Sequence, residues 1–329
     1  MKWLLCIFVL FLFLLSCNTK EDSFFETEPE PEQDLEIIDS VYAGLNMYYL
    51  ENKELTSYDV FDTNLTELEL ENEPFVSQGN IKYYDCSTHA IHLFEEVALP
   101  GMNLSVLGKP FVVVTDSIRH YLGAIWPMYS SANNTVPIID DSPRFYPNDI
   151  IKISMGRSTG PDTRLNDTII QTLKDYDVFH AGISFTIDSI AILENDSVNN
   201  NCTISYTIKI VNNDDLNLYV FDPTKMIDIF YYFHNSLYFK NDDKYYESKN
   251  GGKKPADGVD NLNWLTKINS NDSIKWTLQK TGYPYIPRGN YKYSFTFSGL
   301  NSVEKSVRER PDGLVWVGKL TASDSIDIN

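Results

Sequence analysis

The sequence predicts a mainly β fold with some α+β character, in which a small α+β domain precedes a β-sandwich. Short apolar runs rich in Val, Ile, Tyr and Phe recur along the chain, and many alternate with polar residues as half-buried strands do. Clusters of Asn, Asp, Gly and Pro, which favour turns, separate these runs. A length of 329 residues suggests about two domains.

The first residues are typical of export. Lys2 precedes an unbroken apolar run over residues 3–15, which fits the core of a signal peptide and is too short to span a bilayer. The run ends at Ser16-Cys17, which resembles the lipobox of bacterial lipoproteins. This resemblance implies that residues 1–16 are removed and that the Cys17 thiol carries the lipid of a membrane anchor. An ordinary secretory peptide that contains a cysteine is the alternative.

Residues 17–34 should form an acidic flexible tether, because they contain too few apolar side chains to fold. Within them, Lys20, Glu21 and Asp22 resemble the surface-export signal of Bacteroidota lipoproteins. The resemblance implies an outer-membrane protein that is anchored by lipid and faces the cell exterior. An anchor that faces the periplasm is the alternative.

A recurring triplet, Asp followed by Ser or Thr and an aliphatic residue, resembles the O-glycosylation motif of the same bacterial group. Several copies could arise by chance in a chain rich in Asp and Ser, and Asp-Ser also suits turns. The resemblance makes the hydroxyl residues of the triplets candidate glycosylation sites. They are Ser40, Ser117, Thr168, Ser189, Ser197, Ser273 and Ser325.

Charge and cysteine content limit the classes of function that the chain can have. Residues 18–74 hold 17 acidic and two basic side chains, so −15 of the net charge of −19 lies there. Nucleic acid binding requires a basic footprint and is therefore not expected. Cys86 and Cys202 could pair in an oxidising envelope, but their assignment to different domains favours two buried free thiols. No cofactor is predicted, because no Cys-x-x-Cys, His-Glu-x-x-His or phosphate-binding glycine loop occurs.

The α+β domain is expected over residues 35–155. Apolar residues at helical spacing predict a short amphipathic helix over residues 35–50, and an ordered loop is expected over 127–147. The hydrophobic pattern of residues 73–81 and 108–116 resembles the periplasmic head of SecD-type translocase subunits, which implies a small α+β module without the translocation activity. The expected strands cover 65–70, 81–84, 90–94, 110–115, 120–126 and 150–154.

A linker is expected over residues 156–177, where glycine and proline break regular structure and residues 165–174 could form a connecting helix. Residues 178–329 should be all-β, and their roughly seven short strands suit an immunoglobulin-like sandwich. The turn and strand that begin at Pro287 are similar to those of bacterial domains of this type. The expected strands cover 183–193, 202–211, 216–221, 230–239, 273–278, 290–297 and 314–320.

Histidines and acids do not predict a catalytic or metal site. His89 and His92 could bind a metal on a helix, but their segment is predicted to be a strand, on which they would face opposite sides. Acidic pairs such as Asp140-Asp141 and Asp214-Asp215 are better explained as solvated turns than as calcium ligands. Two carboxylates could serve a glycan hydrolase, but the sequence cannot pair them.

Aromatic side chains make up 13% of the residues, and such side chains serve binding surfaces as well as cores. The candidate ligand contacts are Trp264, Tyr283 and Tyr285. The predicted function is a lipid-anchored, non-catalytic binding or adhesion module whose partner is a glycan, a host protein or an outer-membrane transporter. An accessory lipoprotein of an uptake complex and an envelope glycan hydrolase are the alternatives.

Overall fold

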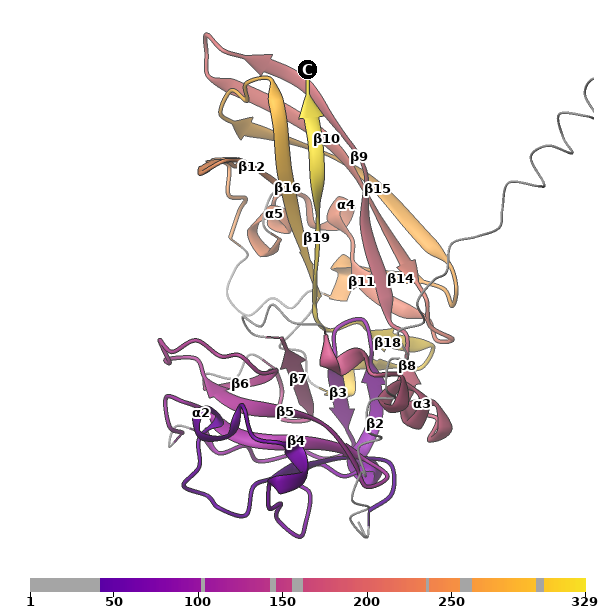
Figure 1. The fold of residues 1–329 in the computed structure, drawn as a ribbon. Helices are drawn as coiled ribbons and strands as arrows, with labels where there is room; N and C mark the ends of the chain where they lie inside the picture. The colour runs from indigo at the N-terminus through magenta and orange to yellow at the C-terminus, as the bar shows by residue number, and fades with distance from the viewer. Residues whose placement is uncertain are drawn as a thin grey trace, which may run out of the picture. The chain divides into compact units, whose positions relative to one another are not determined.

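The computed structural model describes residues 42–101, 104–142, 146–155, 162–234, 237–254, 262–299 and 305–329 (Figure 1). The predictions for the signal peptide, the tether, Cys17, Lys20, Glu21, Asp22 and Ser40 lie outside these described residues. The fold is mainly β with several sheets and few, short helices, as predicted. None of the helices in the described ranges is long and apolar enough to cross a bilayer.

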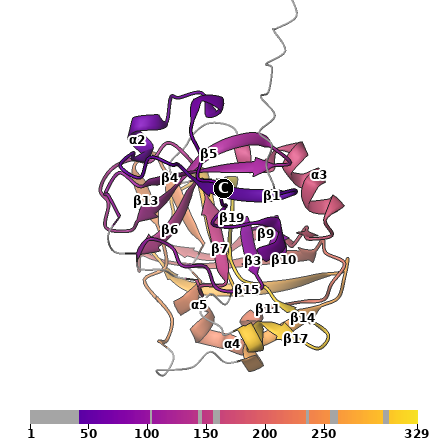
Figure 2. The same cartoon turned by 90° about the horizontal axis from the view of Figure 1, so that it is seen from below.

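The first sheet has eight strands in the order β1-β4-β5-β6-β7-β3-β2-β8. Most neighbours are antiparallel, whereas β6 pairs with β5 and β8 with β2 in parallel. Helix α3 (Asp167–Asp175) contacts β1, β4 and β8, and therefore lies beside both ends of the sheet. Figure 1 shows it next to β8, and Figure 2 shows it next to β1. The strands are β1 (Leu45–Tyr49), β2 (Ile81–Asp85), β3 (Ala90–Leu93), β4 (Lys109–Thr115), β5 (Ile118–Pro127), β6 (Ile138–Ser142), β7 (Ile150–Ser154) and β8 (Phe179–His180).

Both faces of β1 and β4 are buried, because side chains alternate between two separate cores. Met47 and Val113 belong to the core that α3 covers, together with Ile169 and Leu173 of that helix. Their sequence neighbours face a second core, which residues of the 50–70 segment cover. The acidic N-terminal region thus contributes leucines that seal the outer face of this sheet.

The C-terminal residues form three further sheets, ordered β15-β10-β9, β14-β11-β18-β17 and β13-β12-β16-β19. Their strands are antiparallel except for the pair β11–β18. The strands are β9 (Ile183–Asp196), β10 (Asn201–Asn212), β11 (Leu218–Phe221), β12 (Tyr238–Asn241), β13 (Lys244–Tyr246), β14 (Leu265–Ile268), β15 (Ser273–Tyr283), β16 (Gly289–Ser298), β17 (Glu309–Arg310), β18 (Gly313–Val315) and β19 (Lys319–Ile328).

These three sheets share one apolar core, as the facing layers of a sandwich do. The inward side chains of β10 include Ile204, Tyr206 and Ile208, each at most 1% exposed. The Tyr206 ring lies 5.6 Å from that of Phe295 on β16, so the two layers meet through aromatic side chains. The predicted alternation of β10 is therefore confirmed, and it marks the strand at the centre of its sheet.

Short helical turns connect the strands. Their bounds are α2 (Ser57–Val60), η1 (Leu65–Glu67), η2 (Gln78–Asn80), η4 (Thr163–Leu165), α4 (Pro223–Met226), η5 (Ile227–Ile229), α5 (Phe230–Phe233), η6 (Leu262–Trp264) and α6 (Lys305–Arg308). Helix α3 confirms the connecting helix predicted over residues 165–174.

Four local predictions are wrong. The described part of the 35–50 helix is the strand β1, because pairing with the valine-rich β4 outweighs the helical spacing of its apolar residues. Residues 65–70 contain a 3-10 turn capped by Asn64 rather than a strand. The loop expected over 127–147 contains β6. The strand expected over 230–239 begins as helix α5, and Phe230 of this helix and its C-cap residue His234 are both buried.

Candidate functional site

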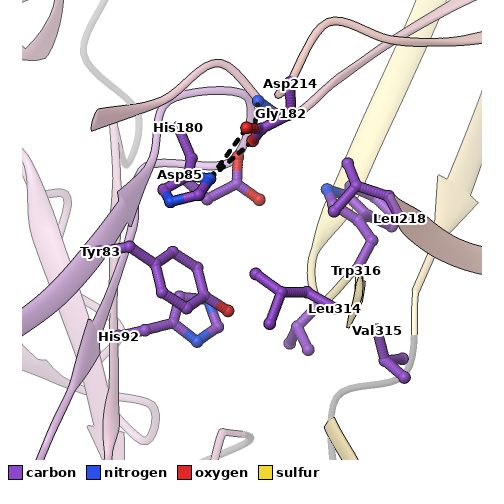
Figure 3. Close-up of a pocket in the computed structure, with 11 residues that line it drawn as sticks. Tyr83, Asp85, His92, His180, Gly182, Asp214, Leu218, Leu314, Val315 and Trp316 are labelled. Carbon is purple, nitrogen blue, oxygen red and sulfur yellow. Dashed lines mark hydrogen bonds and ion pairs between the residues drawn. The ribbon is translucent and has the colours of Figure 1, made fainter. Parts of the chain in front are cut away.

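A small polar hollow lies where the first sheet meets the C-terminal sheets (Figure 3). Strands β2, β3 and β8 and the turn after β10 supply its polar side chains, and the segment around β18 supplies apolar ones. The residues that line it are Tyr83, Asp85, His92, His180, Gly182, Asp214, Leu218, Leu314, Val315, Trp316 and Val317.

Hydrogen bonds between His180 and Asp214 border the hollow. The His180 Nδ1 atom lies 2.9 Å from both carboxylate oxygens of Asp214, which also accepts the backbone N–H of Gly182 at 3.3 Å. Burial alone would raise the pKa of Asp214, but the hydrogen bond and charge of His180 outweigh it and lower the pKa. Asp214 therefore stays ionised and fixes the His180 ring.

Two further rings stack beside this pair. The Tyr83 ring lies over that of His92 with centroids 4.0 Å apart, and the His180 ring meets Tyr83 edge-on at 4.9 Å (Figure 3). Burial, and then the nearby Arg308 charge, lowers the pKa of His92 well below its usual value. His92 is thus a neutral packing side chain at physiological pH, in agreement with the strand predicted for its segment.

The remaining polar groups of the hollow are bound to each other. Ser87 Oγ donates to Asp85 Oδ1 at 2.6 Å, and Trp316 Nε1 donates to Ser87 Oγ at 3.3 Å. A nucleophilic serine would instead need its hydroxyl within hydrogen-bond reach of a histidine base. The hollow has room for about one water molecule. Its chemistry is therefore that of a joint between two layers of the fold.

Two ion pairs connect the same two parts of the fold. Arg308 of α6 pairs with Asp149, which precedes β7, and both side chains are at most 9% exposed. Lys82 of β2 pairs with Glu309 at 2.7 Å in a more exposed position. Among the described residues, no three His, Cys, Asp or Glu side chains gather as a metal site would require.

A different kind of feature, an exposed apolar surface, lies on the first sheet. It consists of Tyr58, Phe61, Val106, Met128 and Tyr129, and is called the aromatic face below. Each of these side chains is between 40% and 52% exposed. Single exposed apolar residues are common, but a cluster of large ones is typical of interaction sites.

Hydrogen bonds hold the three segments of the aromatic face together. Tyr58 donates its hydroxyl to the carbonyl of Asn133, and Ser57 Oγ donates to the carbonyl of Leu107 at 2.6 Å. Tyr129 donates its hydroxyl to the carbonyl of Leu104 at 2.9 Å. The α2 turn and both loops are therefore fixed to one another, and both phenol hydroxyls are used within the protein.

The aromatic residues that the sequence suggested as ligand contacts lie elsewhere. Trp264 is 8% exposed and Tyr283 is 1% exposed, and both belong to the sandwich core. Tyr283 donates its hydroxyl to the carbonyl of Leu237. These two side chains therefore pack in the core and are not ligand contacts. The prediction was wrong because a loop-like sequence does not reveal whether its side chains are buried. Tyr285 is half-buried, and its backbone N–H donates to Asn200 Oδ1 at 3.0 Å.

The candidate glycosylation residues within the described ranges are accessible. Ser117 is half-buried in the turn between β4 and β5, and the others are exposed. Ser189 and Ser325 lie on β9 and β19, which are edge strands of their sheets. The exposed group comprises Thr168, Ser189, Ser197, Ser273 and Ser325.

Both cysteines within the described ranges, Cys86 and Cys202, are free. Cys202 is fully buried, and burial raises the pKa of its thiol to about 11. Cys86 is half-buried, with its pKa raised by the same cause. The two thiols are therefore poor nucleophiles at neutral pH.

Sequence reasoning missed the aromatic face. Its residues come from three segments with no shared periodicity, and a run such as Pro127-Met128-Tyr129 carries no sign of exposure. The acidic composition around α2 is the one signal that marks this region as a surface.

A comparison with protein-family models gave no match, and neither did a comparison with curated proteins.

Proposed function

We propose that this chain is a lipid-anchored cell-surface protein that acts as a non-catalytic binding module. The lipobox at Cys17 and the export motif at Lys20, Glu21 and Asp22 support the location. The aromatic face is the observation that carries the binding role, since it leaves five large apolar side chains in solvent. The polar hollow between the first sheet and the C-terminal sheets has room for about one water molecule, which supports a structural role for it rather than the turnover of a substrate.

The chemistry of the aromatic face favours a protein partner over a glycan. Sugars are recognised by flat rings combined with free hydrogen-bonding groups. Here the Tyr58 and Tyr129 hydroxyls are already bound to backbone carbonyls. Val106 and Met128 add aliphatic surface, and Met adapts its shape to different apolar partners.

Site-specific photo-crosslinking on intact cells tests this proposal. A photoreactive phenylalanine analogue replaces Phe61 in the full chain, and in a matched chain it replaces Val198, which is 89% exposed at the β9–β10 turn. A protein that crosslinks from position 61 and not from position 198 is the expected result. No adduct, or the same adducts from both positions, would refute the binding role of the aromatic face.

The identity of the adduct separates the candidate partners. A host protein would indicate adhesion, and an outer-membrane transporter would indicate an accessory role in uptake. Either outcome supports a non-catalytic binding module.

A further inference from the structure

A second exposed apolar surface lies on the C-terminal half of the chain. It consists of Ile227, Tyr232, Phe233 and Leu262, and is called the Ile227 tip below. Ile227 is 71% exposed, and the other three side chains are between 37% and 45% exposed. The sandwich therefore presents an apolar surface of its own, separate from the aromatic face on the first sheet.

Ring contacts join the two aromatic side chains of the Ile227 tip to each other and to the core. The Phe233 ring lies 5.5 Å from that of Tyr232 and 6.1 Å from that of Trp264. Trp264 ends the η6 turn that begins at Leu262, so α5 and η6 lie side by side. The buried Trp264 thus packs against the exposed Phe233 of the tip.

The backbone of Ile227 is strained. Its φ of 51° and ψ of −124° are those of the first central residue of a type II′ turn, where glycine normally stands. A β-branched residue is strongly disfavoured in this region, because its side chain clashes with the backbone. The strained backbone places the Ile227 side chain in solvent, where it does not contribute to the hydrophobic core.

Lysines border the Ile227 tip. The backbone N–H of Lys253 donates to the carbonyl of Asp228 at 3.3 Å, and a Cβ on the neighbouring Gly252 would lie 2.7 Å from the Tyr232 nitrogen. The 251–254 segment therefore lies directly on the tip. Lys225 joins it from α4, with its ammonium 2.7 Å from the carbonyl of Leu265. Both lysines are exposed, and Asp228 is an exposed acid beside them.

The aromatic face has the opposite charge. Asp59 and Asp62 are exposed next to Tyr58 and Phe61. The segment 51–73 that carries α2 contains eight acidic residues and one lysine, a net charge of −7. An anionic membrane surface would therefore be repelled from the aromatic face, whereas a basic apolar surface would be attracted.

We propose that the aromatic face of one copy binds the Ile227 tip of a second copy. The two surfaces match in apolar character and are opposite in charge, and they lie on different halves of the chain. Such a contact is heterologous, so each copy can bind one neighbour at each surface and the copies join head to tail. This inference rests on the proposed function and names a second copy of the chain as a partner of the aromatic face.

A mixing experiment on the full chain in mild detergent, read by native mass spectrometry, tests the pairing. The natural chain should give a concentration-dependent series of oligomers. Phe61→Ser removes the aromatic face and Ile227→Gly removes the tip while relieving its strain, so each variant alone should be monomeric. An equimolar mixture should form heterodimers and nothing larger, because only one complementary pair of surfaces remains. Each single variant alone should need a concentration at least about tenfold higher than the natural chain to associate, and the comparison is made below that concentration.

Controls separate this pairing from loss of folding and from other modes of association. Val198→Ser, which removes a more exposed apolar group elsewhere, should leave the oligomer series unchanged. Val106→Ser is a second variant of the aromatic face in a loop, and it should complement Ile227→Gly as Phe61→Ser does. Higher salt should weaken association, because the charges across the contact are screened.

Three results would overturn the inference. They are a natural chain that is monomeric at all concentrations, a single variant that still forms homodimers, and a mixture without heterodimers. A different protein crosslinked from position 61 in a chain that does not self-associate would reject the inference and keep the proposed function. If neither self-association nor a specific adduct is found, both fail.

Discussion

At the scale of single residues, two side chains are placed at a cost to the folded state. Ile227 adopts a backbone conformation that favours glycine, and His234 is fully buried among phenylalanine rings. Neither feature can be recognised from the sequence, because the cost depends on backbone geometry and on residues distant in the chain. Each feature leads to a prediction about the free energy of unfolding.

Replacing Ile227 by glycine should stabilise the monomer by about 1 kcal/mol, because strain relief exceeds the added flexibility of the unfolded chain. Little burial is lost, since the side chain is 71% exposed. Urea unfolding of the natural chain and the variant measures the difference. Val198→Gly at the β9–β10 turn, where φ is not positive, should destabilise instead. A loss of stability in Ile227→Gly would show that no strain is stored there.

Acid should destabilise the chain through His234. Burial lowers the pKa of His234 to about 3, whereas an unfolded histidine has a pKa of about 6.5. The unfolded state therefore binds a proton that the folded state refuses, and stability present above pH 6.5 is lost as the pH falls towards 3. Between pH 7 and 4.5 this single group should cost about 3 kcal/mol.

The His234→Phe variant isolates that contribution. Its ring can pack beside Phe230 and Phe297, although the bond from the backbone N–H of Ser298 to His234 Nδ1 is lost. Urea unfolding at the two pH values should show a smaller acid-induced loss for the variant than for the natural chain. Equal losses would mean that His234 does not remain neutral in the folded state.

At the scale of elements, the long alternating strands could be predicted and the short helical turns could not. Strand β7 has the predicted bounds, and β4, β9, β10 and β16 match within a few residues, because their apolar side chains, in continuous or alternating runs, are the ones that pack in the core. The turns α2, η5 and α5 are too short to show a helical period. The aromatic face was missed for a related reason, since hydrogen bonds between distant segments create it.

Helix α3 provides a test at this scale. Asn166 is its N-cap, and Asn166 Oδ1 accepts the backbone N–H groups of Thr168 and Ile169. Asn166→Ala should lower the free energy of unfolding by about 1 kcal/mol, because these donors lose their partner. Gln171→Ala, which removes an exposed bond to Asp175, should cost much less. Equal costs in urea unfolding would contradict the capping role.

At the scale of the whole molecule, the first sheet and the C-terminal sheets are joined by a buried ion pair and by the polar hollow. Asp149→Asn should destabilise the chain by about 3–5 kcal/mol, because it leaves the Arg308 guanidinium buried without a counter-charge. Glu309→Gln is the matched control, since its more exposed pair with Lys82 should contribute less than about 1 kcal/mol. Similar unfolding midpoints for the two variants would show that the buried pair does not hold the joint.

The proposed lipid anchor is also a property of the whole molecule. Cys17→Ala should abolish labelling by a palmitate analogue and leave an uncleaved or released precursor, because the thiol is the acceptor of the lipid. The control is Cys86→Ala, which keeps the lipobox intact and should label as the natural chain does. Labelling of the Cys17→Ala chain would exclude the lipoprotein assignment.

The connection between β8 and β9 has a mechanical consequence. Strand β8 ends at His180 and β9 begins at Ile183, so two residues, Ala181 and Gly182, separate them. Asp214 holds this connection from both sides, through the His180 ring and the Gly182 N–H. A pulling force on the sandwich would therefore pass into the first sheet without a slack segment to absorb it. In a chain that is anchored by its N-terminus, as proposed, tension from a partner bound to the sandwich would therefore be carried by the first sheet as well.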